Sequence, residues 1–391
     1  MKNKVYLFVS NIKGLNTGRG GHYYTVLDHY SFFSKQFHVE VVCIGHEVPI
    51  AFENISNKVR FIPYKNLLDI SATVALMKTI FNKNNCVVNA FDSNAFLFAR
   101  LAGIEKKVPL FFTKCGGAVR SGYTPALHPD VVFHGEDLKF YKEIGGPLNH
   151  RYLEMIPNRV ATSFCDKPKP QDLSLYPQGK LNILRIARLC DKYKESLYQT
   201  IALAQDLKSS GFDVFLAIVG SPENKELTLE LEASIKGLGR LYKSDEITTR
   251  ASRHIIESDI VVAAGRGVME GALAGKLVMI SSKGNDFPIL LTRKIFFDAL
   301  HCNFSDRYSC RDVSSSNDEI KTLLNDINKL KKHKADIALL SQENFSLVSA
   351  SDKYRELYSA LIAAPSIYDK KDLFKHTIKF LLEGVVRKIR S

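Results

Sequence analysis

Residues 258–280 read SDIVVAAGRGVMEGALAGKLVMI. The stretch opens with a β-branched apolar run, passes through glycines into helical spacing and closes on a second apolar run, which predicts strand, turn, helix and strand. Gly265 and Gly267 flank the turn, where a missing Cβ lets the backbone approach a ligand closely. A helix beginning near Val268 would direct free N–H groups at that ligand, and Glu270 could accept both hydroxyls of a ribose. A ligand-free connection in which Glu270 stabilises the helix dipole fits the same residues.

The same alternation of strands and helices runs outward from this stretch. Apolar, β-branched runs predict strands at 5–10, 39–44, 87–91, 110–113, 131–133, 181–187, 213–219, 260–264 and 277–281. Segments of helical spacing predict helices at 23–35, 66–81, 93–101, 195–209, 226–236 and 268–274. Such alternation requires parallel sheets with helices on both faces, so the sequence predicts an α/β fold.

Prolines divide the chain into two parts. Pro168, Pro170 and Pro177 lie close together, where neither a helix interior nor a central strand tolerates them. We therefore expect an N-terminal domain at 1–165, a linker at 166–180, a C-terminal domain at 181–345 and terminal helices with a basic tail at 346–391. Two doubly wound, Rossmann-like domains would face a cleft, where ligand binds at the carboxyl ends of the strands.

Composition excludes several classes of protein. The 391 residues are 45% hydrophobic and 24% charged, which is ordinary for a globular chain and excludes extensive disorder. The chain has no apolar run long enough for a transmembrane helix, and its start is too short in apolar residues for a secretory signal. Seven scattered cysteines without a Cys-x-x-Cys pair indicate reduced thiols, so we expect a cytoplasmic protein.

A net charge of +13 predicts an anionic partner such as a nucleotide, a phospholipid surface or a nucleic acid. Nucleic acid is the partner that the sequence favours least, because the basic residues are dispersed, Trp is absent and no nucleic-acid module is recognisable.

A second group of residues opens the C-terminal domain. Arg188 ends a buried strand, and Lys192 and Lys194 come just before or at the start of the next helix. Two cations at the carboxyl end of a strand would neutralise a diphosphate, Arg through its fork and Lys as a point charge. Solvated surface cations are the simpler alternative.

Three further groups lie in the N-terminal domain. Gly20 and Gly21 follow the first strand and open a helix whose amides could receive a phosphate. The segment 156–160, IPNRV, precedes the linker. Lys114, Cys115, Gly116 and Gly117 follow the strand at 110–113 and would point into the same cleft.

The tail at 370–391 has the pattern of a basic amphipathic helix. Apolar residues recur every three or four positions, and seven Lys and Arg stand against two acidic residues. This composition suits an anionic membrane surface. It equally suits a terminal helix that packs on its own protein with a solvated basic face.

Taken in order, these groups resemble the retaining nucleotide-sugar glycosyltransferases of the GT-B class, especially glycosyltransferase family 4, over roughly residues 4–361. In that family a glycine pair follows the first strand, an IPNGV segment closes the first domain, and an Arg-Leu with a nearby Lys holds the donor diphosphate. An EAMAxGKPVI pattern matches residues 270–280. The resemblance implies C-terminal helices that cross back to the first domain.

The resemblance also implies which residues act. Catalytic roles are implied for Arg188 and Lys194, and the acceptor side for Lys114, Cys115, Gly116 and Gly117. Donor-binding residues are implied at Gly20, Gly21, Arg188, Lys192, Lys194, Gly265, Arg266, Gly267, Val268 and Glu270.

The chain departs from the family pattern at several positions. Val262 stands where the family has a first glutamate, Arg159 replaces a glycine, and Gly265-Arg266 is similar to a bacterial subgroup with Gly-Arg at this loop. The first glutamate usually contacts the sugar, so the identity of the donor sugar does not follow from the resemblance.

Together the residues and the resemblance predict a metal-independent transferase with no cofactor, which moves a sugar from a UDP- or GDP-linked donor to a glycan or lipid-linked glycan. No Asp-x-Asp is present to hold Mg²⁺ on the phosphates. The expected setting is bacterial surface-polysaccharide synthesis at the inner face of the cell membrane. A sugar-nucleotide epimerase or hydrolase of the same fold, or a catalytically silent nucleotide-binding protein, remains an alternative.

Overall fold

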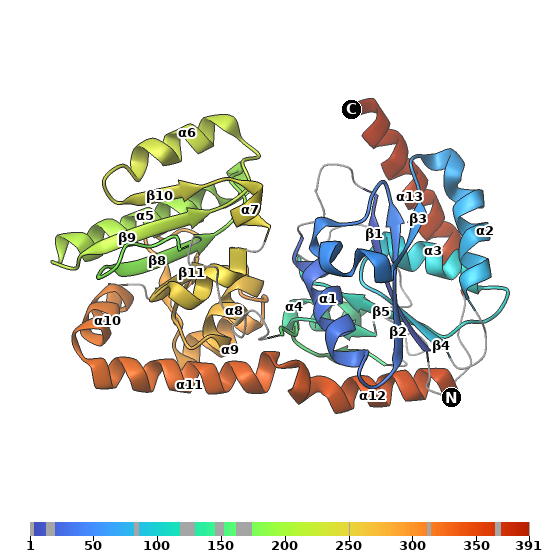
Figure 1. Cartoon of the computed structure of the whole chain (residues 1–391). Helices are drawn as coiled ribbons and strands as arrows, with labels where there is room; N and C mark the ends of the chain where they lie inside the picture. The colour runs from blue at the N-terminus through green and yellow to red at the C-terminus, as the bar shows by residue number, and fades with distance from the viewer. Residues whose placement is uncertain are drawn as a thin grey trace. The chain divides into compact units, whose positions relative to one another are not determined.

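The computed structural model describes residues 4–12, 20–81, 86–117, 130–144, 152–161, 174–249, 251–310, 314–363 and 369–390. The chain divides into two compact units (Figure 1). The first contains Met1–Arg159 and Ala350–Ser391, and the second contains Val160–Ser349. Of the expected linker, residues 166–173 lie outside the described part, whereas Leu175 is buried in the core of the second unit.

The first unit contains a parallel sheet in the order β3-β2-β1-β4-β5-β6-β7. Its strands are β1 (Lys4–Asn11), β2 (His38–Gly45), β3 (Val59–Pro63), β4 (Cys86–Ala90), β5 (Leu110–Lys114), β6 (Val131–Val132) and β7 (Glu154–Met155). Its helices are α1 (Gly21–Phe33), η1 (Ile50–Lys58), η2 (Leu67–Asp69), α2 (Ile70–Ile80), α3 (Ser93–Gly103), α4 (Gly135–Ile144), α12 (Leu347–Ala363), which enters the unit at Ala350, and α13 (Lys370–Arg390). The strand order reverses between β1 and β4, which makes their carboxyl ends the topological switch point.

The second unit repeats this plan in the order β10-β9-β8-β11-β12-β13, in which only β13 is antiparallel to its neighbour. Its strands are β8 (Leu181–Ile186), β9 (Val214–Val219), β10 (Gly239–Tyr242), β11 (Ile260–Ala263), β12 (Leu277–Ile280) and β13 (Ile289–Leu290). Its helices are η5 (Asp191–Tyr193), α5 (Lys194–Ser209), α6 (Lys225–Ser234), α7 (Asp245–Thr248), η6 (Ala251–Glu257), α8 (Arg266–Leu273), α9 (Arg293–Leu300), α10 (Ser314–Asn325) and α11 (Ile327–Phe345). The switch point lies between β8 and β11.

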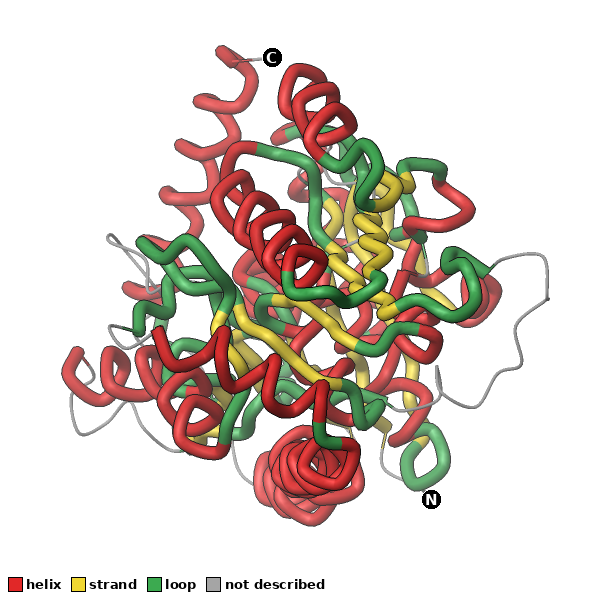
Figure 2. The backbone as a smooth tube through the Cα atoms, turned by 90° about the vertical axis from the view of Figure 1, so that its left-hand side faces the viewer, coloured by secondary structure: helices red, strands yellow, loops and turns green. Residues whose placement is uncertain are grey.

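Alternation along each strand distributes the core over the two faces of the sheet. In the second unit Val261 packs with α8, α9 and α11, whereas Ile260 and Val262 pack with α5 and α6. Successive strand residues point to opposite faces, so a continuous apolar run fills two cores at once. Strands enclosed by helices are visible in the backbone view (Figure 2). The predicted α/β class with two Rossmann-like domains is confirmed.

The last two helices belong to the first unit, as the resemblance implied. Tyr354 and Tyr358 of α12 pack against Phe33, and the Asn89 amide donates to the Tyr358 hydroxyl at 3.0 Å. On the other face of the sheet, Phe380 of α13 joins the core. None of the helices in the described ranges combines the length and apolarity needed to span a bilayer.

The expected elements differ from the structure in two respects. The helix expected at 66–81 is split into η2 and α2, because the Asn66 side chain accepts from Leu68 and Asp69 completes a capping box. The edge strands β3 and β10 were not expected. All six cysteines in the described ranges are free thiols, and Cys165 lies outside them.

Candidate functional site

In the second unit the topology brings the predicted cation group, which begins at Arg188, and the glycine turn at Gly265 to one edge of the sheet. β8 and β11 are parallel neighbours, paired from Ile260 opposite Ile183 to Val262 opposite Arg185. Arg188 follows β8, and the Gly265 turn follows β11. The carboxyl ends of the strands at a switch point form the crevice in which doubly wound sheets bind ligands.

Two of the three predicted diphosphate cations are paired with glutamates on the β9–α6 side of this edge. A guanidinium nitrogen of Arg188 lies 3.2 Å from a Glu223 carboxylate oxygen. The Lys194 ammonium lies 2.8 Å from Glu230. Lys192 is exposed in η5. Exposed pairs of this kind contribute little to stability, so a diphosphate can compete for the same cations.

The glycine turn has a positive φ angle at Gly265, which residues other than glycine rarely adopt. Gly265 has φ +57° and caps α8, and its N–H donates to the Phe304 carbonyl at 2.6 Å. The helix begins at Arg266, two positions before the predicted start. The Val268 N–H donates to the Gly265 carbonyl at 3.1 Å in a tight first turn, and its predicted contact with the donor stays a prediction. Arg266 and Gly267 supply the first amides of the helix.

Glu270 lies in an ion pair with Arg266. The Arg266 Nε atom is 2.7 Å from Glu270 Oε1, and the side chains are only 15% and 11% exposed. A carboxylate has two oxygens and about four lone-pair sites, so this pairing leaves the predicted contact with ribose hydroxyls chemically open. Arg266 thereby orients the acid at the carboxyl edge of β11.

Sequence reasoning missed Arg185, a buried arginine in β8. Its guanidinium donates to the Val262 carbonyl at 3.3 Å and to the Ser196 hydroxyl at 2.7 Å. Burial lowers the pKa of Arg185 to about 10. The guanidinium thus lies beside the backbone of Val262. A charged residue inside the apolar run at 181–187 was the available signal.

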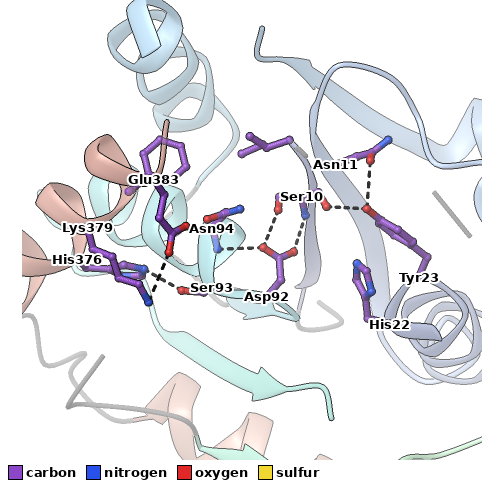
Figure 3. A pocket seen from close by; sticks show the side chains of 12 residues that line it. Ser10, Asn11, His22, Tyr23, Asp92, Ser93, Asn94, His376, Lys379 and Glu383 are labelled. Atoms are coloured by element: carbon purple, nitrogen blue, oxygen red, sulfur yellow. Dashed lines mark hydrogen bonds and ion pairs between the residues drawn. The ribbon is translucent and has the colours of Figure 1, made fainter. Parts of the chain in front are cut away.

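The first unit contains a pocket of about 300 Å³ at its own switch point (Figure 3). It lies at the carboxyl end of β1, at the start of α1 and α3, and against α13. Its lining residues are Ser10, Asn11, Ile12, His22, Tyr23, Asp92, Ser93, Asn94, His376, Lys379, Phe380 and Glu383. Segments from both ends of the chain therefore meet at one cavity.

The carboxylate of Asp92, which lines this pocket, is held by hydrogen bonds. It caps α3 by accepting from the Asn94 and Ala95 amides at 3.0 and 2.9 Å. It also accepts from the Ser10 amide and hydroxyl, each at 2.7 Å. Four donors hold the carboxylate in place, so it positions β1 against α3 (Figure 3).

The wall formed by α1 carries His22. Burial lowers the pKa of His22, while Asp92 acts in the opposite direction. Its ring lies against Tyr23, whose hydroxyl donates to the Ser10 carbonyl at 3.0 Å. Gly20 caps α1, and Gly21 is its first residue. The predicted glycine pair therefore lies next to the pocket, while residues 13–19 fall outside the described part.

The predicted acceptor-side residues lie at the end of β5 and do not line this pocket. The Lys114 ammonium is 2.7 Å from the buried Asp137 carboxylate, and His134 Nε2 is 2.9 Å from the same oxygen. Gly117 has φ +84° in the turn that follows, and Gly116 also has positive φ. Cys115 is half-buried. His134 lies just before α4 and Asp137 lies within it. Neither of these two residues was predicted.

No model of a known protein family matches the chain. Nor does any curated protein match it in sequence. Solved structures do match. Anabaena HepE, in complex with UDP and glucose, has a TM-score of 0.62 and 15% identity over 92% of this chain and 100% of that one.

A glycosyltransferase of Rickettsia africae has a TM-score of 0.62 and 16% identity over 92% of this chain and 99% of that one. A Listeria monocytogenes protein assigned as a UDP-N-acetylglucosamine 2-epimerase has a TM-score of 0.59 and 12% identity, over 91% and 98%. At these identities the similarity shows the fold. The chain has the GT-B architecture of two Rossmann-like domains.

Proposed function

We propose that this protein is a retaining glycosyltransferase that moves a sugar from a nucleoside-diphosphate sugar to a hydroxyl of a glycan or lipid-linked glycan. One observation carries the proposal: adjacent strands β8 and β11 end in the cation group and the glycine turn, at the switch point of one sheet. The similar structures of HepE hold UDP, which supports a UDP-linked donor. A GDP-linked sugar is the other donor that we predict.

The proposed reaction forms one bond at the anomeric carbon of the donor sugar and breaks another. The acceptor hydroxyl oxygen forms a bond to the anomeric carbon while the bond from that carbon to the β-phosphate oxygen breaks. The bonding electrons leave with the nucleoside diphosphate, and the hydroxyl proton passes to the departing phosphate. The protein's task is to stabilise the negative charge that develops on the leaving group.

Arg188 and Lys194 are the residues that we propose for this task. Their charges face Glu223 and Glu230. A diphosphate carries more charge and more acceptor oxygens than either carboxylate, so it would draw both cations away from these exposed pairs. The Arg266 and Gly267 amides at the start of α8 would supply further donors, and Glu270 would accept from the ribose.

We further propose that the reaction needs no metal ion and that the product belongs to bacterial surface-polysaccharide synthesis. The absence of Asp-x-Asp from the sequence supports cations in place of Mg²⁺. Gly116, Gly117, Lys114 and Cys115 remain our proposed acceptor-side residues, together with the pocket at the β1–β4 switch point.

An epimerase or hydrolase is the second candidate, favoured by the similarity to the Listeria protein. That reaction consumes the nucleotide sugar without an acceptor. Product analysis with and without a glycan acceptor distinguishes the two, since only a transferase yields a new glycosidic bond. A catalytically silent nucleotide-binding protein would bind donor and form no product.

Thermal-shift measurements against a panel of nucleotides and nucleotide sugars provide the first test. A donor at about 100 times its Kd should add about 2.7 kcal/mol to the stability of the ligand-bound state. Stabilisation by UDP- or GDP-sugars with no effect of adenosine nucleotides supports the proposal. Indifference to every nucleotide sugar in the panel contradicts it.

A further inference from the structure

The C-terminal helix α13 has a buried face and, opposite to it, an exposed apolar face. Buried residues recur at Asp372, Leu373, His376 and Phe380, spaced three or four positions apart along one side. Exposed residues recur with the same spacing from Phe374, offset so that they lie on the other side. One face therefore docks on the protein, and the other faces outward.

The inner face is anchored to α3 by charge as well as by packing. The Arg100 guanidinium lies 2.8 Å from the Asp372 carboxylate, and both side chains are almost fully buried. The Ser93 hydroxyl and His376 Nε2 are 3.0 Å apart. Glu383 and Lys379, which form an ion pair, line the switch-point pocket from this same side of the helix (Figure 3).

The outer face forms a continuous apolar stripe. It consists of exposed residues that recur over about three turns of the helix. They are Phe374 (66% exposed), Ile378 (40%), Leu381 (37%), Leu382 (61%), Val385 (48%) and Val386 (46%). A stripe of this size on one helix is unusual for a surface that faces only water.

The charges around the stripe are of one sign. Every exposed residue of α13 whose side chain the structure describes is either apolar or a lysine, and the lysines are Lys370, Lys371 and Lys375. Both acidic residues of the helix, Asp372 and Glu383, lie on the inner side. Apolar residues bordered by lysines match an anionic lipid surface.

We propose that the outer face of α13 inserts into the headgroup region of an anionic phospholipid bilayer. The apolar stripe enters the acyl boundary while the lysines contact lipid phosphates. The inner face then holds the switch-point pocket about one helix diameter, roughly 10–12 Å, from the lipid surface. This last point rests on the proposed function, because it places the acceptor-side pocket where a lipid-linked glycan would present its hydroxyl.

Sedimentation of the full-length protein with phospholipid vesicles tests the proposal. Wild type should bind phosphatidylcholine–phosphatidylglycerol vesicles, bind pure phosphatidylcholine vesicles weakly, and be released by salt. The double variant Phe374→Glu, Leu382→Glu should lose on the order of 100-fold in vesicle affinity. Leu339→Glu on α11, 59% exposed, is the matched control and should bind like wild type.

Circular dichroism and melting of the variants should match wild type, because the substituted side chains are exposed. Wild-type protein that ignores anionic vesicles overturns the proposal, as does a double variant that binds them unchanged. A concentration-dependent dimer that the double variant abolishes would assign the stripe to a second copy and also overturn it. Vesicle binding requires no nucleotide sugar, so its outcome is independent of whether the transferase activity is found.

Discussion

Removal of the Asp372 carboxylate should weaken the docking of α13 on the first unit. Asp372→Leu would leave the Arg100 guanidinium buried, at 3% exposure, without its counter-charge. Breaking a buried pair by removing one partner costs about 3–5 kcal/mol. The Asp369 carbonyl, 3.3 Å from Arg100, and the Phe96 ring remain as weaker partners. We therefore expect a cost near the lower limit, about 3 kcal/mol, or a change of roughly 100-fold in the opening equilibrium of the helix.

Amide hydrogen exchange along α13 and α3 measures this opening directly. Asp372→Leu should accelerate exchange in α13 by about two orders of magnitude. The double variant Arg100→Met, Asp372→Leu should recover most of the protection, because no isolated charge remains buried. Asp352→Leu, which breaks the exposed pair with Arg355, is the control and should cost less than about 1 kcal/mol. The reasoning is refuted if Asp372→Leu changes exchange less than tenfold, or if the double variant exchanges as fast as the single one.

Three further changes test the site and its supports. Loss of either proposed cation, in Arg188→Ala or Lys194→Ala, should reduce turnover on the order of 100-fold or more. The control Lys208→Ala, at the far end of α5, should leave turnover unchanged. Full activity of the double variant Arg188→Ala, Lys194→Ala would contradict the assignment. Burial and then the Arg100 charge lower the pKa of His376 to about 3. The stability that the neutral ring contributes is therefore complete above pH 6.5 and declines by up to about 1.4 kcal/mol per pH unit below it. Urea unfolding from pH 7 to pH 4 should show this slope in wild type and not in His376→Gln. Gly265→Ala places a side chain at φ +57° and should destabilise the second unit by about 1–3 kcal/mol in thermal unfolding, and an unchanged midpoint would argue against strain.

Local patterns predicted most of the fold because strand and helix periodicity are properties of neighbouring residues. The apolar runs at 181–187 and 260–264 became β8 and β11 with their ends shifted by about one residue. The edge strands escaped prediction because their local signals are weak. β3 ends in Pro63, and β10 opens with Gly239, residues that usually mark turns or edges.

The candidate site was predicted in part. A parallel doubly wound sheet places its βα loops on one edge, so the sequence alone predicts that Arg188 and Gly265 lie on the same side. The Arg266–Glu270 pair also had a sequence signal in its four-residue spacing. The pairing of Lys194 with Glu230 had none, because it depends on how α5 and α6 lie together.

By itself the sequence determined which segments form strands and helices, where the glycine turn lies, and that the tail is an amphipathic basic helix. It could not decide which face of that helix is buried, because apolar residues recur at helical spacing on both sides of it. Only the tertiary structure decided this, through contacts such as Arg100 with His376, 276 positions apart, that no local pattern contains. Docking on α3 buried one face, formed a wall of the pocket, and left the other face with its lysines exposed.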